Sequence, residues 1–481
     1  MTDSHTTPNG PANTGTYPSL SGEGQGGRTG DGSEKSSGQP PTNLPPEGGR
    51  LVALSSEDRI ETEVLIVGGG MVGMAMAAAL GGAGVPTLLV EAEKLPDMAE
   101  PTFDGRSSAI AYGSQQVLSG IGAWDYIAPS AEPIRDIRVS DGGWQFKEAS
   151  PFFVHYHFAD LQPETIPGSE GRQPPFGWII ENRALRQGLI RRLQELPSVT
   201  HIPAMTVTAI DFQGTTNLAT LSDGRKVQAR LVIGADGRQS AVRRMAGIGA
   251  RELGYKHSAI VCTVTHELPH DGVAHEHFLP IGPFAMLPMK DDQEGRHRSS
   301  IVWTEDARII PMLLGLSDAD LGREIERRFG HTLGRILPIG PRFNYPLKMV
   351  LADTYIKEGL ALTGDAAHGM HPIAGQGFNM GVRDVAALAE KLVDAHRLGL
   401  DIGGLAVLEG YARWRRFDNL MMVLVTDGLT RLFSNDLPPV RLLRDIGFFL
   451  FNKAKPLKRV AMRHAMGIVG DLPRLVRGEK L

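Results

Sequence analysis

A glycine-rich turn near residue 70 carries the residue types that hold a dinucleotide. Gly68-Gly69-Gly70-Met71-Val72-Gly73 follows an apolar strand and opens an alanine-rich helix. Gly68 permits a tight turn, Gly70 lets the backbone approach a pyrophosphate, and Gly73 lets the helix pack on the strand. The N-terminal N–H groups of the helix would face the phosphates. Glu91, 23 residues after Gly68 at the end of a second strand, is placed to accept hydrogen bonds from a ribose.

The same stretch has a competing interpretation as a membrane-spanning helix. Residues 64–90 contain no charged side chain, and about 20 apolar residues suffice to cross a bilayer. Seven glycines and Pro86 lie in this stretch, most of them at turn positions. Because these residues interrupt a continuous helix, the pattern favours the nucleotide site.

Two later segments place an aspartate at the end of an apolar strand. Residues 232–243 read as a buried strand that ends in Gly-Ala-Asp236-Gly, and a strand at residues 360–363 ends shortly before Asp365. Asp365 is placed to accept a hydrogen bond from a polyol hydroxyl. Taken alone, each segment is more often a plain strand-to-turn junction.

A glycine-rich loop follows the second aspartate. Gly375, Gly377 and Gly381 around Asn379 would let the backbone lie against a flat ring. They also open a helix, and the positive end of its dipole favours negative charge. In combination with the first motif, these segments indicate one shared site.

Composition bounds the remaining possibilities. The 481 residues are enough for about three domains, and a net charge of −4 gives no global field that favours nucleic acid. Cys262 is the only cysteine, which excludes an intramolecular disulfide and a cysteine-clustered metal site, and it is expected in the core. The first residues show neither a basic nor an apolar signal region, so a cytoplasmic location is expected.

The order of strand and helix patterns predicts an α/β protein with a second, sheet-based domain. Short strands are expected within residues 204–235 and 258–303, and helices over residues 318–329 and after Gly381. Residues 406–481 have a helical pattern and become increasingly basic.

In combination, the three motifs resemble those of flavoprotein aromatic hydroxylases of the para-hydroxybenzoate hydroxylase type. Within that superfamily the chain is most similar to the ubiquinone-biosynthesis hydroxylases, the UbiH/UbiF group, from about residue 62 to about residue 475. The segments that carry this resemblance are residues 104–106, 133–141, 181–183, 282–288, 364–368, 371–379, 426–429 and 432–435.

The resemblance implies a Rossmann-like FAD-binding domain with an inserted β-sheet substrate domain and a helical C-terminal region. The expected limits are an FAD-binding domain in two parts (59–250 and 351–400), the substrate domain (251–350) and the basic helical region (401–481). The Gly/Pro/Ser-rich tail (1–58) lies outside the resemblance, and its composition predicts disorder, because it has almost no large apolar side chain to bury.

The resemblance also implies a monooxygenase. FAD would be reduced by NAD(P)H or by a protein electron donor, react with O₂ to a C4a-hydroperoxide and hydroxylate the ring of a polyprenylphenol intermediate of ubiquinone. Because the flavin carries the chemistry, no catalytic side chain is assigned, and the phenol needs at most a weak base.

The family's site residues map onto this chain in three groups. Gly68, Gly70, Gly73 and Glu91 would hold the ADP half, with Arg106 and Arg183 near the phosphates and the flavin. Asp236 would support FAD and Asp365 would bind the ribityl chain, with Pro372, Gly375, Gln376, Gly377, Phe378 and Asn379 beside the isoalloxazine. Phe284, Met286 and Pro288 are weak candidates for the substrate pocket.

Histidine pairs raise the alternative of a metal site. His368 and His371 are three residues apart, and His275 and His277 share one face of a strand. Neither pair has a convincing third ligand, so no metal is expected and His368 is expected to order its loop.

The C-terminal segment has the composition of a membrane-surface element. Residues 441–481 carry ten Lys/Arg against three Asp/Glu, and residues 448–451 (FFLF) lie beside Lys453, Lys455, Lys458 and Arg459. Such a cationic, partly aromatic segment suits an anionic bilayer, although a solvated face is equally compatible with composition alone. A lipid-soluble polyprenylated substrate favours peripheral membrane contact.

Two other functions stay open at this point. The chain could hydroxylate a small soluble aromatic, or it could be a non-catalytic FAD-binding subunit of a quinone-biosynthesis complex.

Overall fold

The computed structural model describes residues 59–95, 98, 103, 105–141, 153–214, 216–369, 377–416, 451 and 454–481. Several predicted features lie outside these residues. They are the tail at 1–58, Asp104, the segment from His371 to Gln376 with Pro372 and Gly375, the segments 426–429 and 432–435, residues 448–450, and Lys453.

The first sheet is mostly parallel and has eight strands. Its central order is β17-β18-β11-β1-β2-β8, and β10 and β9 extend from β11. The strands β8, β2, β1, β11 and β18 run parallel to one another, whereas β10 pairs antiparallel with β11 and β17 with β18. The bounds are β1 Arg59–Val67, β2 Thr87–Val90, β8 Val199–Ile202, β9 Val207–Phe212, β10 Asn217–Leu221, β11 Lys226–Gly234, β17 Ile356–Lys357 and β18 Leu360–Leu362.

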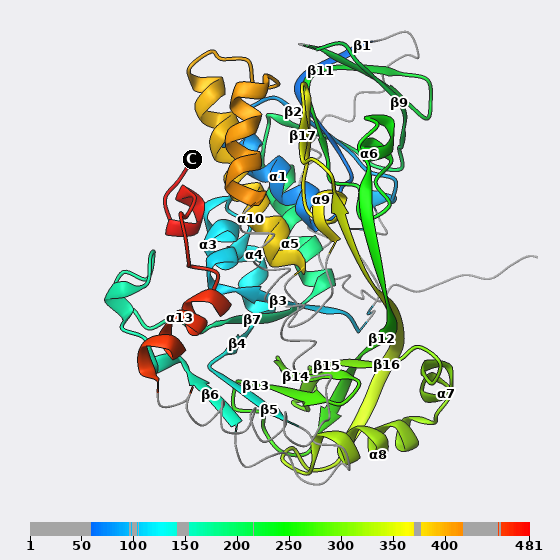
Figure 1. Cartoon of the computed structure of the whole chain (residues 1–481), viewed down its shortest axis with the longest axis vertical. Helices are drawn as coiled ribbons and strands as arrows, with labels where there is room; N and C mark the ends of the chain where they lie inside the picture. Colours follow the sequence, from blue (N-terminus) through cyan, green and yellow to red (C-terminus); the bar gives the residue numbers. More distant parts are fainter. Residues whose placement is uncertain are drawn as a thin grey trace, which may run out of the picture. The chain divides into compact units, whose positions relative to one another are not determined.

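Helices pack against this sheet and complete its core. Helix α1 (Met71–Gly82) is apolar all round, and its residues from Gly73 to Gly81 are buried. It packs against α5 (Asn182–Gln194) and α10 (Gly377–Arg397), as Figure 1 shows for α1 and α10. The uncharged stretch is therefore the inner helix of an α/β layer. None of the helices in the described ranges is both long enough and apolar enough to span a bilayer.

The second sheet has seven strands in the order β16-β12-β15-β14-β13-β5-β6. One face is covered by α8 (Asp318–Phe329), which starts at the Ser317 cap and packs on a core that contains Cys262 and Trp303. Cys262 is thus a core residue, as expected. The bounds are β5 Asp136–Asp141, β6 Phe153–His157, β12 Ala250–His266, β13 Val273–Leu279, β14 Gly282–Met289, β15 His297–Asp306 and β16 Ile336–Ala352.

This sheet differs from the expectation in two ways. Strands β5 and β6 come from the range assigned to the first FAD-binding part, and β6 forms the edge of the second sheet. The 17-residue strand β16 was not predicted, although it pairs with β12 over most of its length. In Figure 1 these two strands run as a long ribbon from the first sheet toward the second.

A small third sheet lies beside the second one. It has the order β3-β7-β4, with bounds β3 Ser107–Ala111, β4 Glu132–Ile134 and β7 Gly177–Glu181. Its apolar side chains share a core cluster with strands β13 and β14 of the second sheet. The remaining helices are α3 Tyr112–Gly120, α4 Trp124–Ile127, α6 Ala241–Met245, α7 Ile310–Leu314, α9 Asp365–His368 and α13 Lys455–Ala465, with short 3₁₀ turns between elements.

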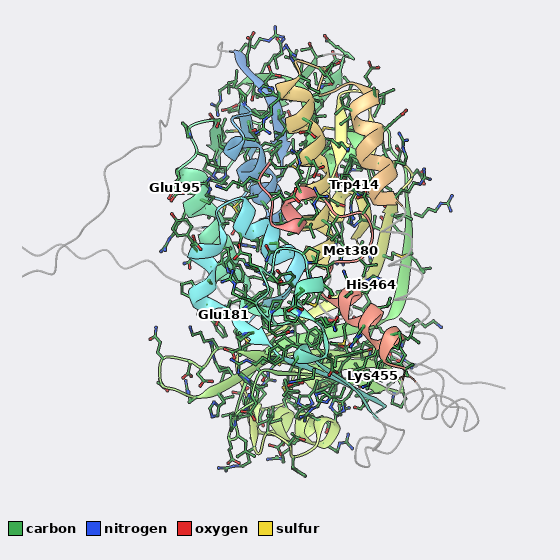
Figure 2. All side chains as sticks on the ribbon, turned by 90° about the vertical axis from the view of Figure 1, so that its left-hand side faces the viewer. Glu181, Glu195, Met380, Trp414, Lys455 and His464 are labelled. Carbon is green, nitrogen blue, oxygen red and sulfur yellow. The ribbon has the colours of Figure 1, made fainter. Side chains whose placement is uncertain are left out.

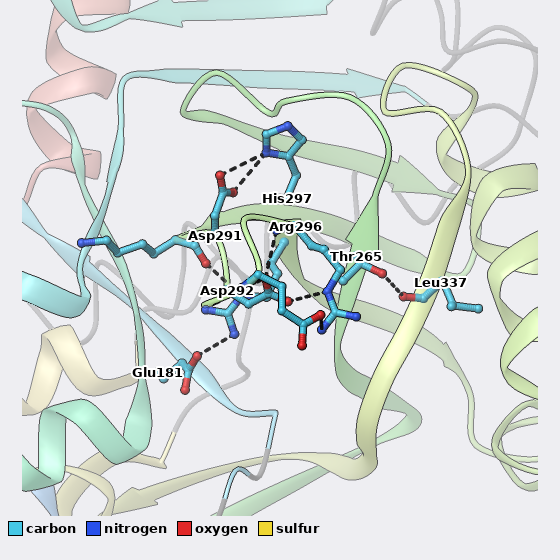
Figure 3. Close-up of polar contacts among 10 residues, drawn as sticks. Glu181, Thr265, Asp291, Asp292, Arg296, His297 and Leu337 are labelled. Carbon is cyan, nitrogen blue, oxygen red and sulfur yellow. Dashed lines mark hydrogen bonds and ion pairs between the residues drawn. The ribbon is translucent and has the colours of Figure 1, made fainter.

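Glu181 connects the third sheet to the second. Its carboxylate accepts a hydrogen bond from Arg298 of β15 at 2.9 Å and another from Arg183, and Glu181 and Arg298 are nearly buried. Figure 3 shows this ion pair at Glu181. Since a buried charge needs its partner, Glu181 is a fixed link between the two sheets.

Glu181→Gln should lower the free energy of unfolding by about 3 kcal/mol, because Arg298 would keep its charge in a buried place without an anionic partner. The matched control is Glu195→Gln, which breaks an exposed pair with Arg192 and should cost less than about 1 kcal/mol. Figure 2 labels both glutamates. Urea unfolding of the two variants measures the difference, and equal losses would contradict the linking role of Glu181.

Candidate active site

The carboxyl ends of four parallel strands meet at one edge of the first sheet. Gly68 follows β1, Glu91 follows β2, Asp236 lies two residues beyond β11, and Asp365 lies three residues beyond β18. In open α/β sheets, ligands bind outside this edge. The structure therefore brings the three sequence motifs to one place.

At each of three positions in the first turn, glycine is required or tolerated for a different geometric reason. Gly68 has φ +104°, and a Cβ there would lie 2.5 Å from the carbonyl oxygen of Ala235. A Cβ on Gly73 would lie 1.9 Å from the carbonyl oxygen of Gly68, so the helix could not approach the strand end. A Cβ on Gly70, by contrast, would have no atom within 4 Å.

The start of α1 offers the donors that a pyrophosphate needs. Gly70 is the N-cap residue, and no side chain caps the helix. The first N–H groups of a helix have no partner within the helix, and they favour an anion. The uncapped helix start and the open space at Gly70 fit the phosphates of FAD.

Glu91 holds the same turn from the second strand. Its carboxylate accepts a hydrogen bond from the N–H of Gly69 and, at 2.8 Å, one from the N–H of Glu93. The side chain is partly exposed beside the glycine turn. Glu91 thus fixes the turn, and contact with a ribose stays a prediction.

Asp236 caps the start of α6. Its Oδ2 accepts hydrogen bonds from the N–H groups of Ala241 and Val242 at 2.7 and 3.1 Å. Its Oδ1 is buried and has no hydrogen-bond partner among the described residues. The backbone beside it contacts Gly68, so the second motif supports the first directly.

Two arginines that sequence reasoning did not single out join the second motif to the third. The Nε of Arg238 donates to Asp365 at 2.9 Å. Arg243 is buried and donates to the carbonyl oxygens of Ala366 and Arg238, both at 2.8 Å. Arg238 directly follows the Asp-Gly pair, and this position was the available signal.

A buried carboxylate anchors the third motif. Asp384 of α10 is fully buried and accepts hydrogen bonds from the N–H of Gly364 at 2.8 Å and from Arg415 Nε at 2.7 Å. His368 Nε2 lies 2.5 Å from the same carboxylate. Burial alone would raise the pKa of Asp384, but His368 and Arg415 hold it below its usual value. His368 thus orders this turn.

The sequence signal for Asp384 was an acidic residue inside an apolar helix. Its neighbours Val385 and Ala386 are buried, so the helix offers Asp384 no solvated face. A charge at such a position needs buried partners. Those partners lie 16 and 31 residues away along the chain, and the pattern does not name them.

The described part of the flavin loop begins at Gly377. Asn379 was expected beside the isoalloxazine, but its amide is occupied by strand β3. Its Oδ1 accepts from the N–H of Ala111 at 2.9 Å, and its Nδ2 donates to the carbonyl oxygen of Ala109 at 2.8 Å. Phe378 packs in the first core. These two side chains position the start of α10.

Arg106 and Arg183 lie close to each other in the fold. The N–H of Asn182 donates to the carbonyl oxygen of Arg106 at 3.0 Å. The guanidinium carbon of Arg106 lies 5.7 Å from the ring centre of Phe343, and that of Arg183 lies 5.2 Å from the ring centre of Phe103. Both cations lie where the third sheet meets the second.

The predicted pocket residues Phe284 and Met286 lie on the side of β14 that faces α8. Both are buried in the core under α8, together with Trp303. Pro288 lies on the same face, because alternate residues of a strand share a side. The opposite face carries Ala285, Leu287 and Met289, which pack toward the third sheet.

Sequence reasoning also missed a group of metal-ligating side chains on β5 and β6. His155 Nε2 and His157 Nδ1 each lie 2.7 Å from the same oxygen of Asp136. Alternation along β6 puts both rings on one face of the sheet, and Asp136, which pairs with His157, lies on the same face. The contacts of both imidazoles with the Asp136 carboxylate explain why the three side chains lie together without a metal ion.

Comparison with known proteins agrees with this geometry. The model of the FAD binding domain family matches residues 61–399, and that of the squalene epoxidase family matches residues 343–472. The chain is 49% identical to the ubiquinone hydroxylase UbiL of Rhodospirillum rubrum, over 92% of this chain and 97% of that protein. It is 36% identical to the 3-demethoxyubiquinol 3-hydroxylase of Escherichia coli, over 85% of this chain and 99% of that one.

The chain belongs to the ubiquinone-biosynthesis FAD-dependent hydroxylase family. The resemblance found in the motifs is thereby confirmed, and the chain is an FAD-dependent aromatic-ring monooxygenase.

Solved structures show the same fold. The p-nitrophenol 4-monooxygenase PnpA of Pseudomonas putida covers 88% of this chain and all of its own, with a TM-score of 0.68 at 21% identity. PqsL of Pseudomonas aeruginosa covers 81% and 99%, with a TM-score of 0.64 at 21% identity.

Gly70→Ala should leave the stability of the apoprotein unchanged and weaken FAD binding at least tenfold. The new methyl group meets no protein atom, but it enters the space that a pyrophosphate would approach. Gly254→Ala is the matched control, because its Cβ is equally unobstructed and Gly254 lies in β12, away from the strand ends. FAD titration followed by flavin fluorescence measures both, and equal affinities would remove Gly70 from the site.

Proposed function

We propose that this monooxygenase hydroxylates the aromatic ring of a polyprenylphenol intermediate in ubiquinone biosynthesis. The observation that carries the proposal is the identity of 49% to a ubiquinone hydroxylase over 92% of the chain. A mitochondrial ubiquinone biosynthesis monooxygenase COQ6, from Danio rerio, is a further relative at 33% identity over 84% of this chain and 89% of its own. Relatives of this name in distant organisms favour a quinone precursor over a small soluble aromatic.

Different site residues would bind different parts of FAD. When it is bound, FAD supplies the chemistry that activates O₂. Gly68, Gly70 and Gly73 with the start of α1 would bind the pyrophosphate, and Glu91 the ribose. Asp365 would bind the ribityl chain while Arg238 orients its carboxylate. The flavin ring would lie by the loop that contains Pro372, Gly375, Gln376 and Gly377.

Two arginines and a set of apolar side chains would control the charge and the water content of the site. Arg106 and Arg183 supply positive charge near the phosphates and the flavin, where they would favour the anionic cofactor. Apolar side chains from the second and third sheets would exclude water from the reacting atoms. Electrons would come from NAD(P)H bound transiently or from a partner protein, because the sequence carries a single nucleotide fingerprint.

The domain assignment follows from the same argument. We propose that the first sheet and its helices, from residues 59–250 and 351–400, form the FAD-binding domain. Residues 251–350, joined by β5 and β6, would form the substrate domain. Residues 401–481 would form the helical C-terminal region, of which α13 is a described part, and its residues Tyr411 and Leu475 pack in the core of the first sheet.

Helix α13 supports peripheral contact with the cytoplasmic face of a membrane. Leu457 and Val460 are 55% and 56% exposed and lie three residues apart on one side of the helix, whereas Met462 is buried. Basic side chains surround them, and Figure 2 labels Lys455 and His464 near the two ends of this helix. An apolar strip with cationic flanks binds anionic lipid. The basic residues of α13 that flank this strip are Lys455, Lys458, Arg459 and Arg463.

Deletion of the gene should make the cell accumulate a quinone precursor that lacks one ring oxygen, because that hydroxylation step would be missing. Mass spectrometry of lipid extracts would identify the precursor and the ring position. Expression of the wild-type chain should restore the quinone, and the Gly70→Ala variant should restore it less well. An unchanged quinone profile in the deletion strain would overturn the pathway assignment.

Replacing Leu457 and Val460 together by serine should weaken binding to vesicles that contain phosphatidylglycerol by at least about tenfold, since burying each apolar side chain is worth about 1.5 kcal/mol or more. The control replaces the exposed residues Leu398 and Leu400 by serine, which lie beyond the end of α10. Cosedimentation measures the bound fraction. Equal binding of both variants would argue against α13 as the membrane contact.

A further inference from the structure

One row of side chains crosses the second sheet and contains a single charged group. Directly paired positions link all seven strands, and paired residues share a face of the sheet. The charged member is Glu276, at the middle of β13. From β6 to β16 the row is Val154, Val139, Glu276, Ala285, Val302, Val261 and Phe343.

Alternation along β13 fixes the face on which Glu276 lies. His275 and His277 pack against Phe329 of α8, with ring centres at 5.2 and 5.3 Å, so they occupy the outer face. Glu276 therefore lies on the inner face with Ala274, which belongs to the core cluster shared with the third sheet. The two histidines belong to a different environment from the glutamate between them.

Two residues at the predicted flavin site, Gly105 and Arg106, contact the inner face of the sheet at its β12 and β16 end. Phe343, at the β16 end of the row, lies under the guanidinium of Arg106 at 5.7 Å. Thr263 of β12 donates to the carbonyl oxygen of Gly105 at 3.3 Å. A substrate between this face and the flavin would thus meet the row that contains Glu276.

Among the described residues, the carboxylate of Glu276 has neither a hydrogen-bond partner nor an ion-pair partner. Its paired neighbours on the two adjacent strands are Val139 and Ala285. It nevertheless keeps part of its surface accessible. An unpaired carboxylate in an apolar layer costs folding free energy, which is typical of a group kept for function.

Two tyrosines of the same layer stay neutral. Burial raises the pKa of Tyr112 of α3 to about 12, and burial does the same for Tyr156 of β6. Burial also raises the pKa of Glu276 from 4.5 to about 7, with no contribution from a neighbouring charge. A base whose pKa lies near the working pH is well matched to a proton transfer.

We infer that Glu276 is a catalytic base that accepts the proton of the substrate's phenol hydroxyl. The inference rests on the proposed function. The proton passes from the phenol oxygen to a carboxylate oxygen of Glu276, and the phenolate pushes electron density to the ring carbons ortho and para to it. With two electrons from the reductant, one oxygen atom of O₂ bonds to an activated ring carbon and the other leaves as water. That carbon then loses its hydrogen as a proton to solvent, the phenol oxygen recovers a proton from Glu276, and the carboxylate is restored.

The test compares Glu276→Gln with wild-type holoenzyme, with 2-prenylphenol as the probe and product quantified by mass spectrometry. The wild-type kcat/KM should rise with pH through about 7 and then level off. In Glu276→Gln it should be about 100-fold lower at pH 8 and should lose this rise, because an amide cannot accept the proton. Glu252→Gln makes the same change at an exposed position of β12, and it should keep the wild-type profile.

A stability measurement separates catalysis from a structural role. The folded pKa of Glu276 lies above its ordinary value, so ionisation destabilises the fold increasingly from pH 4.5 to 7. Glu276→Gln should therefore melt at a higher temperature than wild type at pH 8, and the difference should shrink by pH 5. A lower melting temperature at pH 8 would show that Glu276 is a structural residue and overturn the inference.

The outcomes for the inference and for the proposed function are distinct. If wild-type enzyme hydroxylates 2-prenylphenol and Glu276→Gln does so with the same rate and pH profile, the inference is wrong and the proposed function stands. If wild-type enzyme consumes O₂ with reductant but makes no hydroxylated prenylphenol, the proposed function fails first.

Discussion

Parallel pairing of β1 with β2 and β11, and of β11 with β18, is the constraint on which the site depends. It puts the carboxyl ends of these strands on one edge, so Gly68 and Asp365 meet although they are 297 residues apart in sequence. The glycines are the consequence of this convergence. A Cβ on Gly381 would lie 2.5 Å from a methyl group of Val72, because α1 and α10 meet beside the turn at Gly364. Side chains at these positions would push the motifs apart.

The sequence predicted what local pattern determines. The glycine turn, the strands β9 to β11 and helix α8 all lie where their periodicity and turn residues indicated. Long-range pairing was less visible, because nothing in the sequence of β5 indicates that it pairs with β13, which lies more than 100 residues later in the chain. The sequence also does not show which residues of β14 face α8. All eight of its residues are buried, so the strand has no polar alternation that would separate the side toward α8 from the side toward the third sheet.

The buried carboxylate of Asp384 and the partly buried one of Glu276 show how the surroundings of an acidic group decide whether it serves structure or chemistry. Asp384 has His368, Arg415 and the N–H of Gly364 around it, and its pKa is held low, so it is a permanent anion that fixes the turn before Asp365. Glu276 has apolar neighbours, and burial raises its pKa to about 7, so it can exchange a proton under ordinary conditions. Asp384 holds the third motif in place, and Glu276 is the base that we propose for the substrate.

Amide hydrogen exchange with and without added FAD tests the convergence of the motifs most directly. If one FAD lies across the strand ends, it should slow exchange together in residues 68–73, 236–243 and 364–369, and leave the exposed end of β12 near Glu252 unchanged. Protection confined to the first of these segments, or absent from all three, would contradict a single site built from the three motifs.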